Sequence, residues 1–279
     1  YLYYLYYIIL YYIILYYYIM AAQSQCQINI SALEENLEML FRNTPGRIFR
    51  KQGKSTGSNT TIDFSTKRGK IIKDGIYFIT VTPNRIAASH AIILLVSENG
   101  TNFSVFDPNG KETVNDPDWY NLKVFVNNEL QDINTDLSPN KSINNVEGGV
   151  CGIWSIVISI LLNKVAIGEL TEQDKMIFLN FLNKTNNGEQ FIQNINNSFF
   201  KGNKHYDGMA NVRNLVNNIT EIIKEQIESE KLINKGGKKK TIRKYLRNTN
   251  KRTSKKNTNK KKRNKSRNKK RSKTNKKRN

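Results

Sequence analysis

Basic residues are gathered at one end of this chain, and that segregation limits which part of it can fold. The last 44 residues, 236–279, contain 23 lysines and arginines and no acidic residue, whereas the remainder holds 22 basic and 23 acidic residues. The basic segment has almost no apolar side chains, so it cannot bury enough surface to offset the entropy of ordering its backbone. We therefore expect a disordered polybasic tail and a nearly neutral folded part.

The first nineteen residues consist only of tyrosine, leucine and isoleucine. Their length matches a membrane span, but ten are tyrosines, which favour the headgroup region, and no basic residues precede them as in a signal peptide. All three residue types can be encoded by codons of A and T alone. We interpret 1–19 as a translated A/T-rich leader ahead of Met20, with a membrane segment as the alternative, and 20–235 as one domain.

Strand patterns are concentrated between residues 75 and 128. Four segments are rich in β-branched and aromatic residues, namely 75–81, 90–96, 102–107 and 122–128. Asn99-Gly100 is a strong tight-turn signal, so the second and third segments are predicted to pair as a hairpin whose opposite residue numbers sum to about 199 or 200. The stretch 43–61, rich in glycine, serine and asparagine, is predicted to be a loop.

Helical patterns lie on both sides of these strands. Ser31 and Glu34 have the spacing of a capping box, which predicts a short helix. The apolar run 151–163 fits a buried helix with Trp154 in the core, Thr171 followed by acidic residues marks the start of another, and 211–232 has apolar residues three and four apart. The order of helix, strands and then helices predicts an α+β fold.

The chain has two cysteines and two histidines. Cys26 and Cys151 allow at most one disulfide, and no cysteine or histidine spacing indicates zinc, so we expect free thiols in a reducing compartment and neither metal nor cofactor. Cys151 opens the apolar run, and Gly148-Gly149 lets the backbone turn sharply into it. A helix N-terminus lowers the pKa of a thiol, so Cys151 has the surroundings of a nucleophile.

His90 and Asp107 complete a candidate triad. His90 begins one predicted hairpin strand and Asp107 ends the other, which places them close together in a register that the sequence leaves open. The imidazole can then deprotonate Cys151 while Asp107 accepts its other N–H and fixes its tautomer. Taken singly, each has a plainer interpretation as a buried cysteine, a packed histidine or a turn aspartate, but their order and spacing favour a catalytic site.

His90, then Asp107, then Cys151-Gly152 at the head of an apolar helix resembles the SUMO proteases, which process ubiquitin-like modifiers, and their adenovirus-type relatives, the adenains. The resemblance covers roughly residues 75–165. It implies a papain-like cysteine protease fold in which His90 is the base, Asp107 orients it and Cys151 is the nucleophile. It also implies cleavage of peptide or isopeptide bonds, often after Gly-Gly or Gly-x-Gly.

Three positions differ from that family's pattern. Ala91 follows the histidine where an aromatic residue is usual, and Val150 precedes the cysteine where aspartate is frequent. The glutamine that the family places six or seven residues before its cysteine is replaced by Asn145 or Asn144. An asparagine amide can donate the same hydrogen bond to an oxyanion over a shorter reach. We select Asn145 first and Asn144 as the alternative, with the backbone N–H of Cys151 as the second donor.

A second arrangement uses the other histidine. Cys151, His205 and Asp207 follow the order of papain-like and deubiquitinating enzymes, although the interval from Cys151 to His205 is short for those folds and no strand pattern surrounds it. An acyltransferase is a further alternative, because the same triad can pass an acyl group to an amine. The competing class is a non-enzymatic basic nucleic-acid-binding protein.

The composition of 236–279 predicts the partners of this segment. Dense positive charge attracts phosphates, and Tyr245 alone offers an aromatic ring, so we expect binding to DNA or RNA without sequence preference. Nuclear targeting is the alternative. The sequence thus predicts a cysteine protease acting on a ubiquitin-like conjugate or a viral precursor. We expect it in the cytoplasm or nucleus of a host cell, or in a virion, without membrane association.

Overall fold

The computed structural model describes residues 32–56, 59–64, 72–82, 89–144, 150–201, 206 and 208–234. The chain divides into two units, 1–223 and 224–279, and His90, Asp107 and Cys151 all belong to the first. Several predictions fall on residues outside the described ranges: the leader 1–19, the tail 236–279, Ser31, Cys26, Asn145, Gly148-Gly149, His205 and Asp207.

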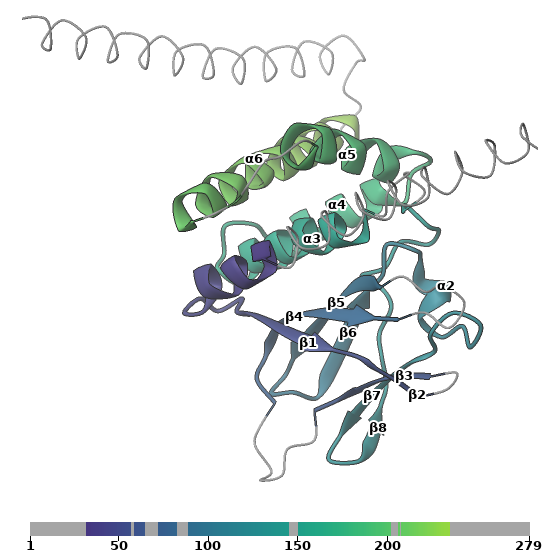
Figure 1. Cartoon of the computed structure of the whole chain (residues 1–279). Coiled ribbons are helices and arrows are strands. Elements are labelled where there is room, and N and C mark those ends of the chain that lie inside the picture. Colours follow the sequence, from purple (N-terminus) through teal and green to yellow (C-terminus); the bar gives the residue numbers. More distant parts are fainter. Residues whose placement is uncertain are drawn as a thin grey trace, which may run out of the picture. The chain divides into compact units, whose positions relative to one another are not determined.

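Two four-stranded sheets make up the β part of the first unit (Figure 1). Their orders are β1-β4-β5-β6 and β2-β3-β7-β8. The strands are β1 Ile48–Gln52, β2 Lys54–Thr56, β3 Asn59–Asp63, β4 Gly75–Val81, β5 His90–Ser97, β6 Asn102–Phe106, β7 Leu122–Val126 and β8 Glu129–Gln131. The β1–β4 and β3–β7 pairs are parallel and the other pairs are antiparallel.

The four predicted strands are confirmed as β4, β5, β6 and β7, with ends that shift by two residues at most. In the β5–β6 hairpin Ser97 lies opposite Asn102, which is the lower of the two registers predicted from the turn. Asn99 and Gly100 both have positive φ, a backbone conformation that glycine and asparagine adopt more easily than other residues do. The same register, continued beyond β6, places Asn109 opposite His90.

The prediction of a loop over 43–61 is wrong, because β1, β2 and the start of β3 lie there. The sequence of β1 reads as charged, yet Ile48 is buried and the strand pairs in parallel with the strongly apolar β4. Ile62 of β3 is buried in the same way, in the cluster that joins the two sheets. Pairing with distant strands stabilises these segments, and a local pattern does not report such pairing.

The helices include 32–41, α2 Lys111–Val114, α3 Cys151–Ala166, α4 Glu172–Leu182, α5 Asn187–Ile195 and α6 Met209–Asn234, with a π-helical turn, η1, at Asn196–Phe200. The predicted helices at 151–163 and 211–232 are confirmed as α3 and α6. Thr171 caps α4 as predicted: its hydroxyl accepts a hydrogen bond from the backbone N–H of Asp174, whose carboxylate accepts from the N–H of Thr171. The α+β class is therefore confirmed.

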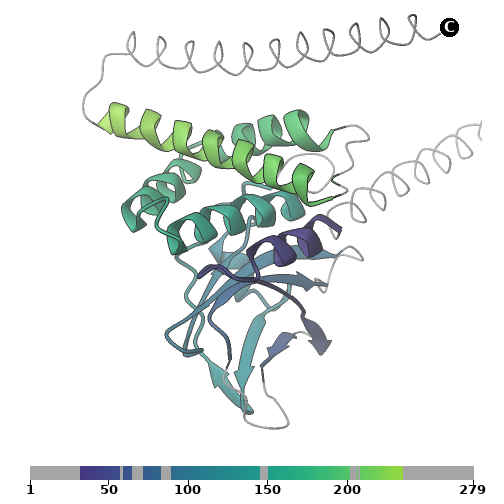
Figure 2. The ribbon, with the colours of Figure 1, turned by 90° about the vertical axis from the view of Figure 1, so that its left-hand side faces the viewer.

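β5 is apolar between its two end residues, His90 and Ser97, because both of its faces are covered. Ile92 and Leu94 belong to the cluster between the sheets, while α3 packs on the opposite face (Figures 1 and 2). Trp154 of α3 is fully buried, lies beside Phe106 and donates its indole N–H to the carbonyl of Ile143 at 3.3 Å, so its predicted core role is confirmed. Strands buried on both faces read as continuous apolar runs.

Among the described residues, no helix combines the length and the apolar character that crossing a bilayer requires.

Candidate active site

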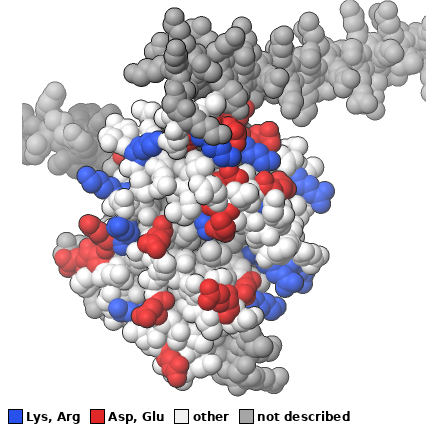
Figure 3. Space-filling view, turned by 180° about the vertical axis from the view of Figure 1, so that it is seen from behind, with Lys and Arg blue, Asp and Glu red and all other residues white. Residues whose placement is uncertain are grey.

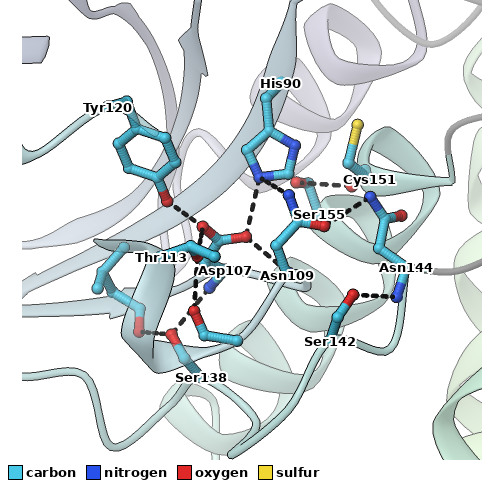
Figure 4. Close-up of polar contacts among 12 residues, drawn as sticks. His90, Asp107, Asn109, Thr113, Tyr120, Ser138, Ser142, Asn144, Cys151 and Ser155 are labelled. Carbon is cyan, nitrogen blue, oxygen red and sulfur yellow. Dashed lines mark hydrogen bonds and ion pairs between the residues drawn. The ribbon is translucent and has the colours of Figure 1, made fainter. Parts of the chain in front are cut away.

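The β5–β6 hairpin and the start of α3 converge at one end of the first sheet. His90 is the first residue of β5, Asp107 follows the last residue of β6, and Cys151 is the first residue of α3. Because α3 packs across β5, these termini meet, and the structure brings the three predicted triad residues together (Figure 4).

The imidazole of His90 is bound to the carboxylate of Asp107. Nε2 of His90 lies 2.8 Å from Oδ1 of Asp107, and the exposed fractions of the two side chains are 6% and 0%. A charge-assisted hydrogen bond out of contact with water holds the ring in one orientation. Asp107 thus contacts the imidazole, and its role as the orienter of a base stays a prediction.

Asp107 is surrounded by hydrogen-bond donors. Its Oδ2 accepts from the hydroxyls of Thr113, at 2.8 Å, and Tyr120, while its Oδ1 accepts from the backbone N–H of Asn109 at 2.7 Å. The backbone N–H of Asp107 itself donates to the hydroxyl of Ser138. Burial, together with the charge of Asp107, raises the pKa of Tyr120 well above its ordinary value, so the phenol keeps its proton and acts as a donor.

Sequence reasoning missed these supporting residues. The Asp107–Asn109 contact had a local signal, because an aspartate in a turn accepts from the N–H two residues later. Thr113 and Tyr120 had none, since α2 and the segment before β7 bring them to the carboxylate only in the folded chain.

The other ring nitrogen of His90, Nδ1, lies on the side of Cys151 (Figure 4). Burial would raise the pKa of the Cys151 thiol, but a hydrogen bond to His90, the charge of the imidazole and backbone groups of Ala91 and Gly152 outweigh it and lower that pKa. Burial would lower the pKa of His90, but the charge and hydrogen bond of Asp107, assisted by Cys151, raise it to about 10. Both shifts favour a thiolate beside an imidazolium.

The start of α3 also favours the thiolate. Cys151 is a free, partly exposed cysteine, and the first turn of the helix contains no acidic side chain. The N-terminal end of a helix carries a partial positive charge from its backbone N–H groups, which stabilises an adjacent anion. The sulfur thus has both of the features that activate a cysteine nucleophile.

Asn144 joins the cluster through Asn109. Its side-chain nitrogen lies 3.0 Å from Oδ1 of Asn109, and its backbone N–H donates to the hydroxyl of Ser142 at 3.3 Å (Figure 4). Within the described part of the chain, its own Oδ1 is buried without a hydrogen-bond partner. Of the two predicted oxyanion donors, the structure brings Asn144 to the site, while Asn145 lies outside the described residues.

The alternative histidine and aspartate, His205 and Asp207, also lie outside the described residues. Tyr206, between them, contacts Phe199 and Phe200 of η1 and Asn36 of the helix 32–41. In the described ranges no group of three histidine, cysteine, aspartate or glutamate side chains is arranged to hold a metal ion.

A scan against protein-family models finds no match for this chain, and no curated protein and no solved structure is significantly similar to it.

Proposed function

We propose that the protein is a cysteine peptidase that cleaves peptide or isopeptide bonds with Cys151 as nucleophile, His90 as acid and base, and Asp107 as the group that orients His90. The single observation that carries the proposal is the arrangement of Asp107, hydrogen-bonded to His90, with the other side of that imidazole turned toward Cys151 at a helix N-terminus (Figure 4). The resemblance of these residues to the SUMO proteases and adenains supports a papain-like type of fold.

The residues present account for each step of such a reaction. The Cys151 thiolate attacks the carbonyl carbon of the scissile bond, and the oxygen that becomes negative accepts hydrogen bonds from the N–H of Cys151 and the amide of Asn144 or Asn145. Protonated His90 then gives its Nδ1 proton to the leaving amine, and a thioester remains on the sulfur. His90 next takes a proton from water, whose oxygen displaces the sulfur and releases a carboxylic acid.

The resemblance favours substrates that end in Gly-Gly or Gly-x-Gly, either ubiquitin-like conjugates or viral precursors. If an amine rather than water attacks the thioester, the same residues catalyse acyl transfer, so products must be identified by mass. A free thiol nucleophile fits the cytoplasm, the nucleus or a virion, where thiols stay reduced.

The test is labelling and cleavage in matched variants. Ubiquitin-like modifiers with a C-terminal thiol-reactive group, and fluorogenic Gly-Gly peptides, should react with the wild type and with Cys26→Ser but not with Cys151→Ala. His90→Gln should abolish turnover, whereas His205→Gln should leave it intact. Turnover that survives His90→Gln but not His205→Gln would transfer the role of base to the other histidine and overturn the proposal.

Nucleic-acid binding by 236–279 is a second proposed function, supported by its 23 basic residues without an acidic one. In Figure 3 acidic and basic side chains are interspersed over the visible face of the described residues, so that face offers no single-sign patch of its own.

A tail that engages about six phosphates loses roughly a thousandfold in affinity between low and moderate salt. Fluorescence anisotropy with duplex DNA should show that loss, and deletion of 236–279 should remove binding. If binding survives the deletion, the assignment is wrong.

A further inference from the structure

Asn109 links the imidazole of His90 to Asn144. Its side-chain nitrogen lies 3.4 Å from Nε2 of His90, and its side-chain oxygen lies 3.0 Å from the side-chain nitrogen of Asn144. Its backbone N–H donates to Asp107, so the turn after β6 holds the residue in place (Figure 4). The triad reaction described above gives Asn109 no role.

Whether Nε2 of His90 carries a hydrogen decides whether Asn109 must present a hydrogen-bond acceptor or a donor to it. The groups around the Asp107 carboxylate are all donors, namely the hydroxyls of Thr113 and Tyr120, the N–H of Asn109 and Nε2 of His90. A carboxylate can only accept from them. Nε2 therefore carries a hydrogen both in the imidazolium and in the neutral tautomer that takes a proton from Cys151 through Nδ1.

A side-chain nitrogen of Asn109 facing that N–H would set one donor against another. The two ends of an asparagine amide have the same shape, and the neighbouring donors and acceptors decide which end lies where. A half-turn of the Asn109 amide places its oxygen at Nε2 and its nitrogen toward Asn144. A matching half-turn of the Asn144 amide then places its oxygen opposite the side-chain nitrogen of Asn109. The Asn144 oxygen, which is buried without a partner in the described chain, accepts a hydrogen bond from that nitrogen.

We propose that Asn109 is a positioning residue whose side-chain oxygen shares the single N–H on Nε2 of His90 with Asp107, as the more distant of two acceptors, and whose side-chain nitrogen donates to the oxygen of Asn144. The inference deepens the proposed function and rests on it. The acceptor at Nε2 stabilises the imidazolium, in addition to Asp107. The donor gives the buried oxygen of Asn144 the hydrogen-bond partner that it otherwise lacks in the described chain.

The titration of His90 depends on every group that faces its imidazole, so the effect of Asn109 is measured as a difference between variants that keep the other groups. Asp107 comes from the end of β6, Cys151 from α3, and Tyr120 from the segment before β7, where it stays protonated across the working range. Trp119 approaches the ring edge-on and carries no charge. Replacing Asn109 with leucine therefore removes the amide contact without adding or removing a charge.

The experiment compares wild type, Asn109→Leu and Asn109→Asp by kcat/KM against pH with a Gly-Gly substrate. Because a hydrogen bond to a charged group favours the charged form, Asn109→Leu should move the alkaline limb down by about half to one pH unit. Asn109→Asp keeps an acceptor and should not move it down. An unchanged limb in Asn109→Leu would reduce Asn109 to a structural role. An upward shift of the alkaline limb in Asn109→Leu would show that Asn109 presents a donor to Nε2. Either of these two results for Asn109→Leu overturns the inference.

An NMR titration of the His90 imidazole separates this inference from the proposed function, because it needs no turnover. The background His205→Gln leaves a single histidine signal. If the wild type cleaves nothing through Cys151, the proposed function fails, yet a lower His90 pKa in Asn109→Leu still supports the hydrogen bond. Should the leucine variant not fold, Asn109→Ala is measured in its place and must shift the pKa in the same direction.

Discussion

The two ends of the proposed triad are held in different ways. At the carboxylate end, Asp107 is fully buried and receives hydrogen bonds from Thr113, Tyr120, the backbone of Asn109 and His90. At the sulfur end, Cys151 is partly exposed, and its state depends mainly on the imidazole and the helix terminus. Many hydrogen bonds thus fix the position of the Asp107 carboxylate, so the loss of one of them leaves others in place. The thiolate form of Cys151, in contrast, depends on only a few neighbouring groups.

Among changes to the groups that support the imidazole, the largest effect should come from removing the charge of Asp107. Asp107→Asn keeps the shape of the side chain but takes away the anion that stabilises protonated His90. We expect kcat/KM to fall by roughly 10²–10⁴-fold, the usual contribution of a positioned acid and base. Steady-state kinetics with the Gly-Gly peptide checks this, with Asp136→Asn, an exposed loop residue, as the control. A loss below tenfold would mean that Asp107 does not orient the base.

The next test addresses the state of the sulfur. The rate of alkylation of Cys151 by iodoacetamide should rise with pH around a pKa below that of an ordinary thiol. His90→Gln should raise the pKa of Cys151 again, because the imidazolium is the first of the groups that lower this pKa. The pH dependence of alkylation in a Cys26→Ser background measures both values. Equal pKa values in the two proteins would show that His90 does not activate the thiol.

The raised pKa of His90 also predicts the pH dependence of stability. Its pKa is higher in the folded chain, at about 10, than its ordinary value of 6.5, so protonated His90 stabilises the fold. This contribution is complete below about pH 6.5 and is lost as the pH rises through about 10. Urea unfolding of wild type and His90→Gln should therefore show a stability difference that narrows over that window. A difference that widens would contradict the sign of the shift.

A smaller effect, on the free energy of unfolding, should follow from removing one of the hydrogen bonds to the Asp107 carboxylate. Tyr120→Phe removes one donor from Asp107 but leaves Thr113, Asn109 and His90 in place. We expect a loss of about 1–3 kcal/mol in the free energy of unfolding, because a buried charged acceptor keeps one partner fewer. Urea unfolding measures it, and Thr113→Val is the matched single-donor change. If the two variants together lose no more than one alone, the contacts are not independent.

The smallest effect should lie far from the site. Thr171→Ala removes the hydroxyl that caps α4, which should lower the free energy of unfolding by about 1 kcal/mol and leave kcat/KM unchanged. Thermal unfolding and peptide cleavage measured on one preparation provide both readings. A change in kcat/KM as large as that of Tyr120→Phe would show that the site is sensitive to general destabilisation and would weaken the comparison between its two ends.

The sequence predicted the features that depend on neighbouring residues. The turn at Asn99-Gly100 limited the hairpin to two registers, and the apolar run after Cys151 predicted α3, so local patterns made His90, Asp107 and Cys151 candidates and the family resemblance suggested their roles. What it missed depends on distant partners. β1 is a strand because β4 pairs with it, and Tyr120 reaches Asp107 because the chain returns from α2 toward β7.

The hairpin that carries His90 and Asp107 has a consequence for the order of events during synthesis. These two residues are 17 positions apart in sequence, and both emerge from the ribosome before α3 is made. Pairing across a short loop closes quickly, whereas docking of a later helix on β5 requires contacts between distant parts of the chain. We therefore expect His90 and Asp107 to meet in the nascent chain before Cys151 is in place, so that the proposed site is completed only when α3 docks.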